Sequence, residues 1–456
     1  MPRSTQTSLE RRLGPLDAAA IVVANVIGAG ILFTPPFIAS MAPHPVWFLS
    51  TWIAGGVLAF FGAMAYAELA ALRPRAGGEY VYLREAYGPL AGFMTGWASF
   101  VAGFAGPIAA SAIFLIIVLD RFIPGAANST PFFVIPLPYV PLTFSTHTLL
   151  AMTAAWLFAF VHIVGVGPGR VVMNALATLK VLAFLVFIAA GFAVGVGSSA
   201  NLQQAAVAAV SPTNWLLALV PVMYAYSGWN AAAYMAEEIR DPGRNVPRAL
   251  LMGTIGVIII YALLNLLYLY AIPVDQLAAV KGSVFDFIGE RMLGARAGNI
   301  LAVVAIISVA AGINAWTFAG PRIYYAMARD GVFFPAAAQV HPKFKTPHVS
   351  IVAQAAWASI LILTGSLDTL TNYVGFAITL FGGIAVAAIF VLRAREPNAP
   401  RPYKTLGYPV APAIFVAAMF AIVVNAIYQR PQQTGLGLVV MAAGIPLYMW
   451  LTRRRR

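Results

Sequence analysis

The sequence predicts an all-α integral membrane protein with twelve transmembrane helices, a five-plus-five inverted repeat and discontinuous helices 1 and 6. Three observations predict this fold class. Hydrophobic residues make up 61% of the 456 residues and charged residues only 9%, whereas soluble domains have about 25% charged residues. The apolar residues lie in long uncharged runs. Glycine interrupts two of these runs at matching places, at residues 28–30 and 227–229.

Each predicted helix is a run long enough to cross the hydrocarbon core, which takes about 17–25 residues. The longest run needs a strong tilt to fit. No hydrophilic stretch between the runs is long enough for a soluble domain. In chain order the predicted spans are 16–41, 46–72, 88–119, 147–166, 171–194, 214–237, 249–272, 297–322, 349–365, 369–392, 409–428 and 435–451.

The distribution of positive charge predicts the orientation. With twelve spans both termini lie on one side, and most of the 28 Lys and Arg residues fall in segments on that side. Since cytoplasmic loops carry the excess of Lys and Arg, we expect both termini in the cytoplasm and the chain in the plasma (inner) membrane. The net charge of +13 is therefore an orientation signal and does not indicate a partner nucleic acid.

The domain organisation follows from the span order. An inverted repeat relates two sets of five helices across the membrane and places the first helix of each set near the midplane. We expect a cytoplasmic N-terminal segment at 1–15, a first repeat at 16–194 (helices 1–5), a second repeat at 214–392 (helices 6–10), helices 11 and 12 at 409–451, and a basic cytoplasmic tail at 452–456.

The two glycine interruptions predict a binding site for a zwitterion. A broken helix exposes N–H groups where one half begins and C=O groups where the other half ends. The N–H end suits a carboxylate and the C=O end suits an ammonium group, and a free α-amino acid carries both. Close helix packing through small residues is the alternative explanation for either interruption alone.

Lys180 is the second sign of function, because it lies near the middle of the predicted span 171–194. An ionisable residue at a helix centre costs about 2.5–3.5 kcal/mol on insertion scales and normally faces a polar interior. We expect its ammonium group to take the place of a coupling cation beside the carbonyl groups of a broken helix. It could also exchange a proton during transport. A purely structural lysine remains the alternative.

Three stretches resemble the amino acid-polyamine-organocation transporter superfamily, and within it the L-type amino acid transporter branch. Residues 26–35 (VIGAGILFTP) resemble the G-S-G-I-F segment of the family's first helix. Residues 66–69 (YAEL) with 74–80 (PRAGGEY) resemble the hallmark that ends helix two. Residues 224–248, from YAYSGWN to the loop EEIRDPGRNVPR, resemble helix six and its inner loop.

The resemblance implies alternating access, with the substrate held at the broken helices. The substrate carboxylate would meet the N–H groups beside Gly28, those of Ala29, Gly30 and Ile31. The amino group would meet carbonyl groups near Ile27 and around Gly228, those of Tyr224, Ala225 and Ser227. The gating residues would be Tyr224 and Trp229, Trp316 matches a helix-eight tryptophan near the substrate, and Lys180 matches a lysine of sodium-independent members.

The sequence departs from the family pattern in two ways. Ala29 replaces the serine between the two glycines, which removes a hydroxyl group and keeps the backbone donors. The chain has no cysteine, so a disulfide-linked heavy subunit of the animal type is not expected. The expected partners are an amino acid substrate and the lipid bilayer. No cofactor and no metal are implied.

The acidic residues near the first inner loop are expected to have a mainly structural role. We expect the acids at the cytoplasmic rim to pair with the arginines there, namely Glu68, Glu79 and Glu85 with Arg73, Arg75 and Arg84. With those acids set aside, no cluster within the spans suits an intramembrane enzyme, and no ring of charge suggests a channel. Sodium-independent exchange of neutral amino acids is the favoured function. The alternatives are a cationic amino acid or polyamine exchanger, proton-coupled uptake, and a transporter-like sensor.

Overall fold

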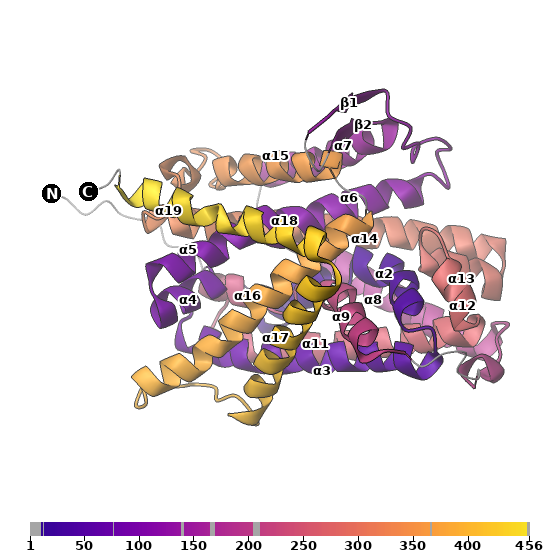
Figure 1. Ribbon diagram of the computed structural model, residues 1–456, viewed down its shortest axis with the longest axis horizontal. Coiled ribbons are helices and arrows are strands. Elements are labelled where there is room, and N and C mark those ends of the chain that lie inside the picture. The colour runs from indigo at the N-terminus through magenta and orange to yellow at the C-terminus, as the bar shows by residue number, and fades with distance from the viewer. Residues whose placement is uncertain are drawn as a thin grey trace.

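The computed structural model describes residues 11, 13–75, 77–137, 141–164, 169–203, 210–364 and 367–453. These residues form a bundle of long helices, with one short β-hairpin at the edge (Figure 1). The hairpin pairs β1 (Phe133–Ile135) with β2 (Leu142–Phe144) in antiparallel register.

The helices follow one another along the chain with short connections. In order they are α1 (Pro15–Val26), α2 (Ala29–Met41), α3 (Pro45–Leu72), α4 (Glu79–Tyr87), α5 (Pro89–Ala98), the π-helix η1 (Ser99–Phe104), α6 (Ala105–Leu119), α7 (Thr146–Val164), α8 (Gly169–Val194), the 3₁₀ turn η2 (Ser199–Leu202), α9 (Pro212–Ala225), α10 (Ala231–Tyr234), the 3₁₀ turn η3 (Ala236–Glu238), α11 (Pro242–Ala271), α12 (Val274–Ala279), α13 (Val284–Leu293), α14 (Ala295–Arg329), the 3₁₀ turn η4 (Pro335–Ala338), α15 (His348–Thr364), α16 (Leu367–Arg395), α17 (Val410–Gln429), α18 (Pro431–Ala442) and α19 (Gly444–Arg453). Many of them begin at proline, which has its backbone angle preset for the first helical turn and lacks an N–H that would be left unpaired there.

Within the described residues, nine helices are long and apolar enough to cross a membrane, and the bent pair α1–α2 raises the number to ten. The protein is therefore a multi-pass membrane protein. Helices also lie at the two remaining predicted spans, but α9 with α10 falls outside that count and α15 is a shorter apolar helix. The number twelve stays a prediction.

The predicted span 88–119 is continuous but irregular. The π-helix η1 stands between α5 and α6, so the run of 31 residues is not one regular α-helix. A π-helix is rare and often lies at a functional site, because it turns side chains out of the regular helical register. The sequence analysis did not predict this element.

The two ends of the bundle differ. The helix α4 lies at one end, and α12, α13 and the β-hairpin lie toward the other (Figure 1). The connection between the predicted spans 88–119 and 147–166, and the one between 249–272 and 297–322, therefore lie away from α4 (Figure 1).

The ion pairs at the α4 end correct part of the expected pairing. Glu85 pairs with Arg73 and lies 3.8 Å from Arg75, as expected. Glu68 does not pair with the arginines expected for it, because α16 brings Arg393 to within 2.6 Å of its carboxylate. The Glu68 carboxylate also accepts the backbone N–H of residue 405 and lies 3.2 Å from the guanidinium of residue 401. It therefore ties α3 to the segment between α16 and α17.

Candidate functional site

The first candidate element is the break in the span 15–41. The helix α1 ends at Val26, α2 begins at Ala29, and the two helices are bent by 41°. Within the described part of the chain, no acceptor receives the N–H groups of Ala29, Gly30 or Ile31. Because α2 is 13 residues long, its dipole adds a partial positive charge at this end. The break therefore presents donors suited to an anionic group.

The second break lies directly against the first. The helix α9 ends at Ala225, and α10 begins only at residue 231. A Cβ atom on Gly30 would lie 2.7 Å from the Cα of Ala225, so the start of α2 and the end of α9 touch backbone to backbone. Gly228 has φ of 99°, and a Cβ there would lie 2.8 Å from the Cβ of Asn25 in α1. Both glycine interruptions thus allow close packing as well as a helix break.

Tyr261 of α11 joins the two breaks. Its hydroxyl group lies 2.8 Å from the carbonyl oxygen of Val26 and 3.1 Å from that of Ala225. Its proton is therefore shared between the last residue of α1 and the last residue of α9. The side chain is fully buried. The sequence analysis missed this residue, because nothing in the pattern of α11 separates it from the other tyrosines of that helix.

Lys180 of α8 reaches the end of α1. Its ammonium group donates a hydrogen bond of 3.0 Å to the carbonyl oxygen of Ala24 and a second to that of Ile27. The residue has 0% exposure, so the charge is stabilised by these backbone dipoles. The Ile27 carbonyl, expected to meet the substrate amino group, is thus already occupied on one side by the lysine.

The aromatic residues of the expected site lie close to the breaks but in different surroundings. Tyr224 packs against Phe33 of α2, with their ring centroids 5.9 Å apart. Trp229 packs edge-on against Tyr66 of α3 at 4.9 Å. Trp316 of α14 packs against the π-helix residue Phe104 at 5.5 Å. Each ring therefore links a broken helix or α14 to a different neighbour.

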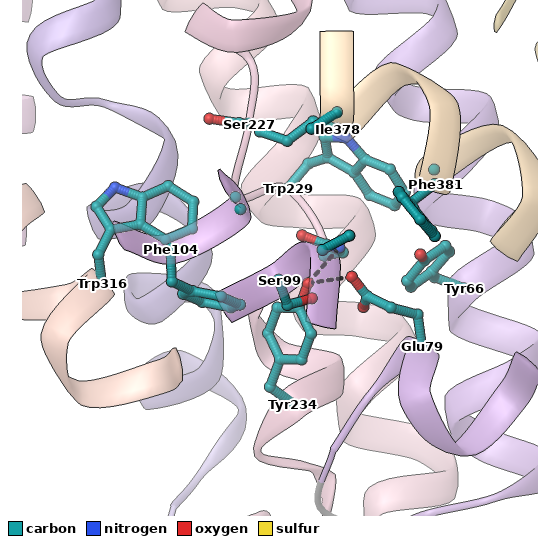
Figure 2. Close-up of a pocket in the computed structure, with 16 residues that line it drawn as sticks. Tyr66, Glu79, Ser99, Phe104, Ser227, Trp229, Tyr234, Trp316, Ile378 and Phe381 are labelled. Carbon is teal, nitrogen blue, oxygen red and sulfur yellow. Dashed lines mark hydrogen bonds between the residues drawn. The ribbon is translucent and has the colours of Figure 1, made fainter. Parts of the chain in front are cut away.

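A small pocket, whose lining residues are mostly buried, lies beside the second break and joins several of these residues (Figure 2). We refer to it as the closed pocket. Its volume is about 50 Å³, which holds a few water molecules and is too small for a large side chain. Some of the residues that line it were expected at the site from the sequence, and others were not. The lining residues are Tyr66, Glu79, Ala98, Ser99, Gly103, Phe104, Ser227, Gly228, Trp229, Asn230, Tyr234, Trp316, Ala377, Ile378, Phe381 and Gly382.

Glu79 corrects the expectation of a rim ion pair. No Lys or Arg of the described residues pairs with it, and its carboxylate accepts a hydrogen bond of 2.8 Å from the hydroxyl of Tyr234. Asn230 in turn donates to that hydroxyl at 2.8 Å (Figure 2). Glu79 lies in α4, between the spans, and burial raises its pKa to about 7, against the effect of the Tyr234 hydrogen bond. The motif PRAGGEY contains Glu79, but nothing in this motif predicts that its side chain is buried.

The structure brings most of the expected site together. The residues of the two breaks, Ile27–Ile31 and Tyr224–Gly228, lie in contact, with Lys180 at the end of α1 and Trp316 across the pocket. The arrangement offers backbone donors, backbone acceptors and an aromatic wall. In the described residues no group of His, Cys, Asp or Glu could hold a metal ion.

A helical membrane protein with broken helices packed around a buried pocket has the architecture of a secondary transporter. Comparison with known protein families supports this class of protein. The chain belongs to the amino acid permease family, whose model matches residues 13–450. At the level of the family the protein is a transporter and not an enzyme.

Individual relatives align along almost the whole chain. The large neutral amino acids transporter small subunit 2 of Rattus norvegicus is 29% identical, over 97% of this chain and 80% of its own length. The cystine/glutamate transporter of Homo sapiens is 29% identical, over 98% of this chain and 86% of its own. The serine/threonine exchanger SteT of Bacillus subtilis is 25% identical, over 98% of both chains.

Proposed function

We propose that this protein is a sodium-independent exchanger of neutral L-amino acids that works by alternating access. The single observation that carries the proposal is the contact between the two helix breaks, where the open N–H groups of α2 lie beside the end of α9. A substrate carboxylate bound to Ala29, Gly30 and Ile31 would place its amino group toward the carbonyl oxygens of Tyr224 and Ser227. This geometry recognises the α-carboxylate and α-amino groups of an amino acid and does not constrain its side chain.

The names of the relatives support a shared backbone site with a variable side-chain site. One is named for large neutral amino acids, one for serine and threonine, and one for cystine and glutamate. These substrates share only the α-amino and α-carboxylate groups. In this chain the wall that faces the side chain would be the closed pocket, with Ser99, Phe104 and Trp316. These three side chains carry no charge, which favours a neutral substrate side chain.

Lys180 supports independence from sodium. Its ammonium group already supplies a positive charge to the carbonyl oxygens at the end of α1. A sodium ion at the same carbonyl groups would face repulsion from a like charge in a site with little water. The lysine therefore takes the role that a coupling cation would otherwise have.

Alternating access needs parts that move and gates that close. We propose Tyr224 and Trp229 as the gating residues, twelve spans with α9–α10 as the second broken span, and two inverted repeats at 16–194 and 214–392. Both termini then lie in the cytoplasm, on the side of α4, in the plasma (inner) membrane. The sequence has no cysteine with which to bind a heavy subunit through a disulfide.

Exchange in proteoliposomes tests the proposal. Vesicles loaded with unlabelled leucine, serine or glutamine should take up labelled amino acid much faster than empty vesicles, equally with sodium or with choline outside. Uptake that needs sodium, or that does not depend on internal substrate, would contradict the proposal. Faster exchange with arginine, lysine or putrescine would favour the cationic alternative, and binding without uptake would favour a sensor.

A further inference from the structure

Glu79 is a buried carboxylate in the pocket that the mechanism above does not use. It lies at the first position of α4 and lines the closed pocket, while the next residue, Tyr80, lines a separate polar cavity. That cavity holds about 750 Å³ and is lined by charged residues from the same end of the bundle, among them Arg84, Glu237 and Asp330. The start of α4 therefore separates the small pocket from a larger one lined by charged residues.

The contacts of Glu79 favour a neutral acid. One carboxylate oxygen, Oε1, accepts the hydroxyl of Tyr234, and the other, Oε2, is buried with no hydrogen-bond partner among the described residues. A buried ionised carboxylate is costly unless cations or several donors surround it. A protonated acid carries no net charge and keeps the hydrogen bond from Tyr234.

Among the described residues, no Lys or Arg side chain pairs with Glu79. The titratable groups that face it are tyrosines: Tyr66 of α3, Tyr82 of its own helix α4 and Tyr234 of α10. The π-helix contributes Ser99 to the pocket and α16 contributes apolar side chains. Since a neutral tyrosine supplies at most one hydrogen bond, the site can stabilise a carboxylate only weakly.

The position of Glu79 is fixed by its neighbours. Gly78 has φ of 51°, and a Cβ atom there would lie 2.4 Å from the ring of Tyr234. The pair Gly77–Gly78 thus lets the start of α4 approach α10 closely. The hydrogen bonds then run from Glu79 through Tyr234 to Asn230, two residues after Gly228 (Figure 2). The carboxyl group is therefore connected directly to the second helix break.

We propose that Glu79 is a proton-binding site of the inner pathway, protonated while the pocket is closed and ionised when the pocket opens to the polar cavity. The proposal rests on the proposed transport function. On opening, the O–H bond of the carboxylic acid breaks, its proton passes to water, and the electron pair stays on the carboxylate. On closing, the carboxylate takes a proton from water again. The proton acts as a ligand that stabilises the closed pocket.

The raised pKa of Glu79 determines how the closed–open equilibrium depends on pH. Burial raises the pKa of Glu79 from its ordinary 4.5 to about 7 in the closed pocket, so the closed form binds the proton more tightly than an open, hydrated form. The closed form is therefore favoured at acid pH, and this advantage is lost as pH rises from about 4.5 to about 7. Each unit of pKa difference corresponds to about a tenfold change in the closed–open equilibrium.

Infrared spectroscopy of the purified protein tests the proton site without transport. A titration should show the carbonyl band of a protonated carboxylic acid disappearing near neutral pH. Glu79→Gln should lose that band, whereas Glu290→Gln, which changes an exposed carboxylate paired with Arg121 near α13, should keep it. Tyr234→Phe removes the hydroxyl donor to the carboxylate and should move the midpoint to higher pH. A band that is absent, or unchanged in Glu79→Gln, would overturn the proposal.

Exchange at varied internal pH tests the consequence. The wild-type rate should fall about tenfold or more between about pH 7.5 and about pH 5. Since glutamine resembles the neutral acid, Glu79→Gln should keep the low acid rate at every pH, and Glu290→Gln should follow the wild type. A Glu79→Gln variant with the wild-type pH profile would refute the proton site while leaving exchange intact. An infrared titration without any exchange by the wild type would instead refute the proposed function.

Discussion

The hydroxyl group of Tyr261 offers the sharpest test of how the two helix breaks are held together. Tyr261→Phe removes one oxygen atom and keeps the ring, which packs against Trp52 and Tyr226. The carbonyl oxygens of Val26 and Ala225 lose the single hydroxyl proton that lies between them. A matched control lies two turns further along α11, because Tyr268 is equally buried and its hydroxyl has no partner among the described residues.

The size of the effect can be worked from these contacts. A hydrogen bond between membrane helices contributes about 0.6 kcal/mol on average and about 1.7 kcal/mol at most. Because one proton is shared between two carbonyl oxygens, its loss together with the unpaired carbonyl groups costs about 1–2 kcal/mol. We expect Tyr261→Phe to lower the free energy of unfolding by this amount. Tyr268→Phe should change it little or raise it slightly.

The measurement is unfolding of the detergent-solubilised protein, with and without a saturating amino acid, together with exchange in proteoliposomes. Because the lost bonds lie at the ends of α1 and α9, Tyr261→Phe should also weaken substrate binding, and the stabilisation by substrate should shrink. Equal unfolding and exchange in Tyr261→Phe and the wild type would refute the reasoning. So would damage of the same size in Tyr268→Phe.

Three further predictions concern single contacts. Gly30→Ala places a Cβ atom 2.7 Å from the Cα of Ala225 and should abolish exchange. The control Gly28→Ala adds a Cβ atom that meets no atom within 4 Å, and this variant should fold normally. Thermal stability and exchange of both variants test this prediction. Lys180→Met keeps an unbranched side chain, one atom shorter, but removes the ammonium group and its two hydrogen bonds to the carbonyl oxygens of residues 24 and 27. Exchange should then fall at least about tenfold, as for the loss of about 1.4 kcal/mol or more. Normal exchange at every pH would contradict the assigned role. Glu68→Gln weakens the two charged hydrogen bonds from Arg393, the ion pair with residue 401 and the hydrogen bond from the N–H of residue 405. It should cost about 1.5–3 kcal/mol of unfolding free energy, measured in denaturant, while substrate affinity in the folded protein stays unchanged.

The sequence alone determined the class of protein, because the bilayer imposes strong and local rules. A helix must satisfy its own backbone hydrogen bonds in lipid, so long uncharged runs identify the spans without knowledge of their neighbours. The same rule made the glycine interruptions visible, and both are present in the structure, after Val26 and after Ala225. Lys180 was visible for a related reason, because a charge at a helix centre is costly enough to need an explanation.

Only the tertiary structure decided which side chains meet. Tyr261 and Tyr268 look alike in the sequence of α11, yet one joins the two breaks and the other has no partner among the described residues. Glu79 resembled the rim acids in the sequence, but the close approach of α4 to Tyr234 buries it away from the arginines. Hydrophobicity and charge depend on a residue itself, whereas burial and hydrogen bonding depend on segments as distant as α4 and α10. Local pattern therefore gave the spans and the breaks, and packing gave the network that connects them.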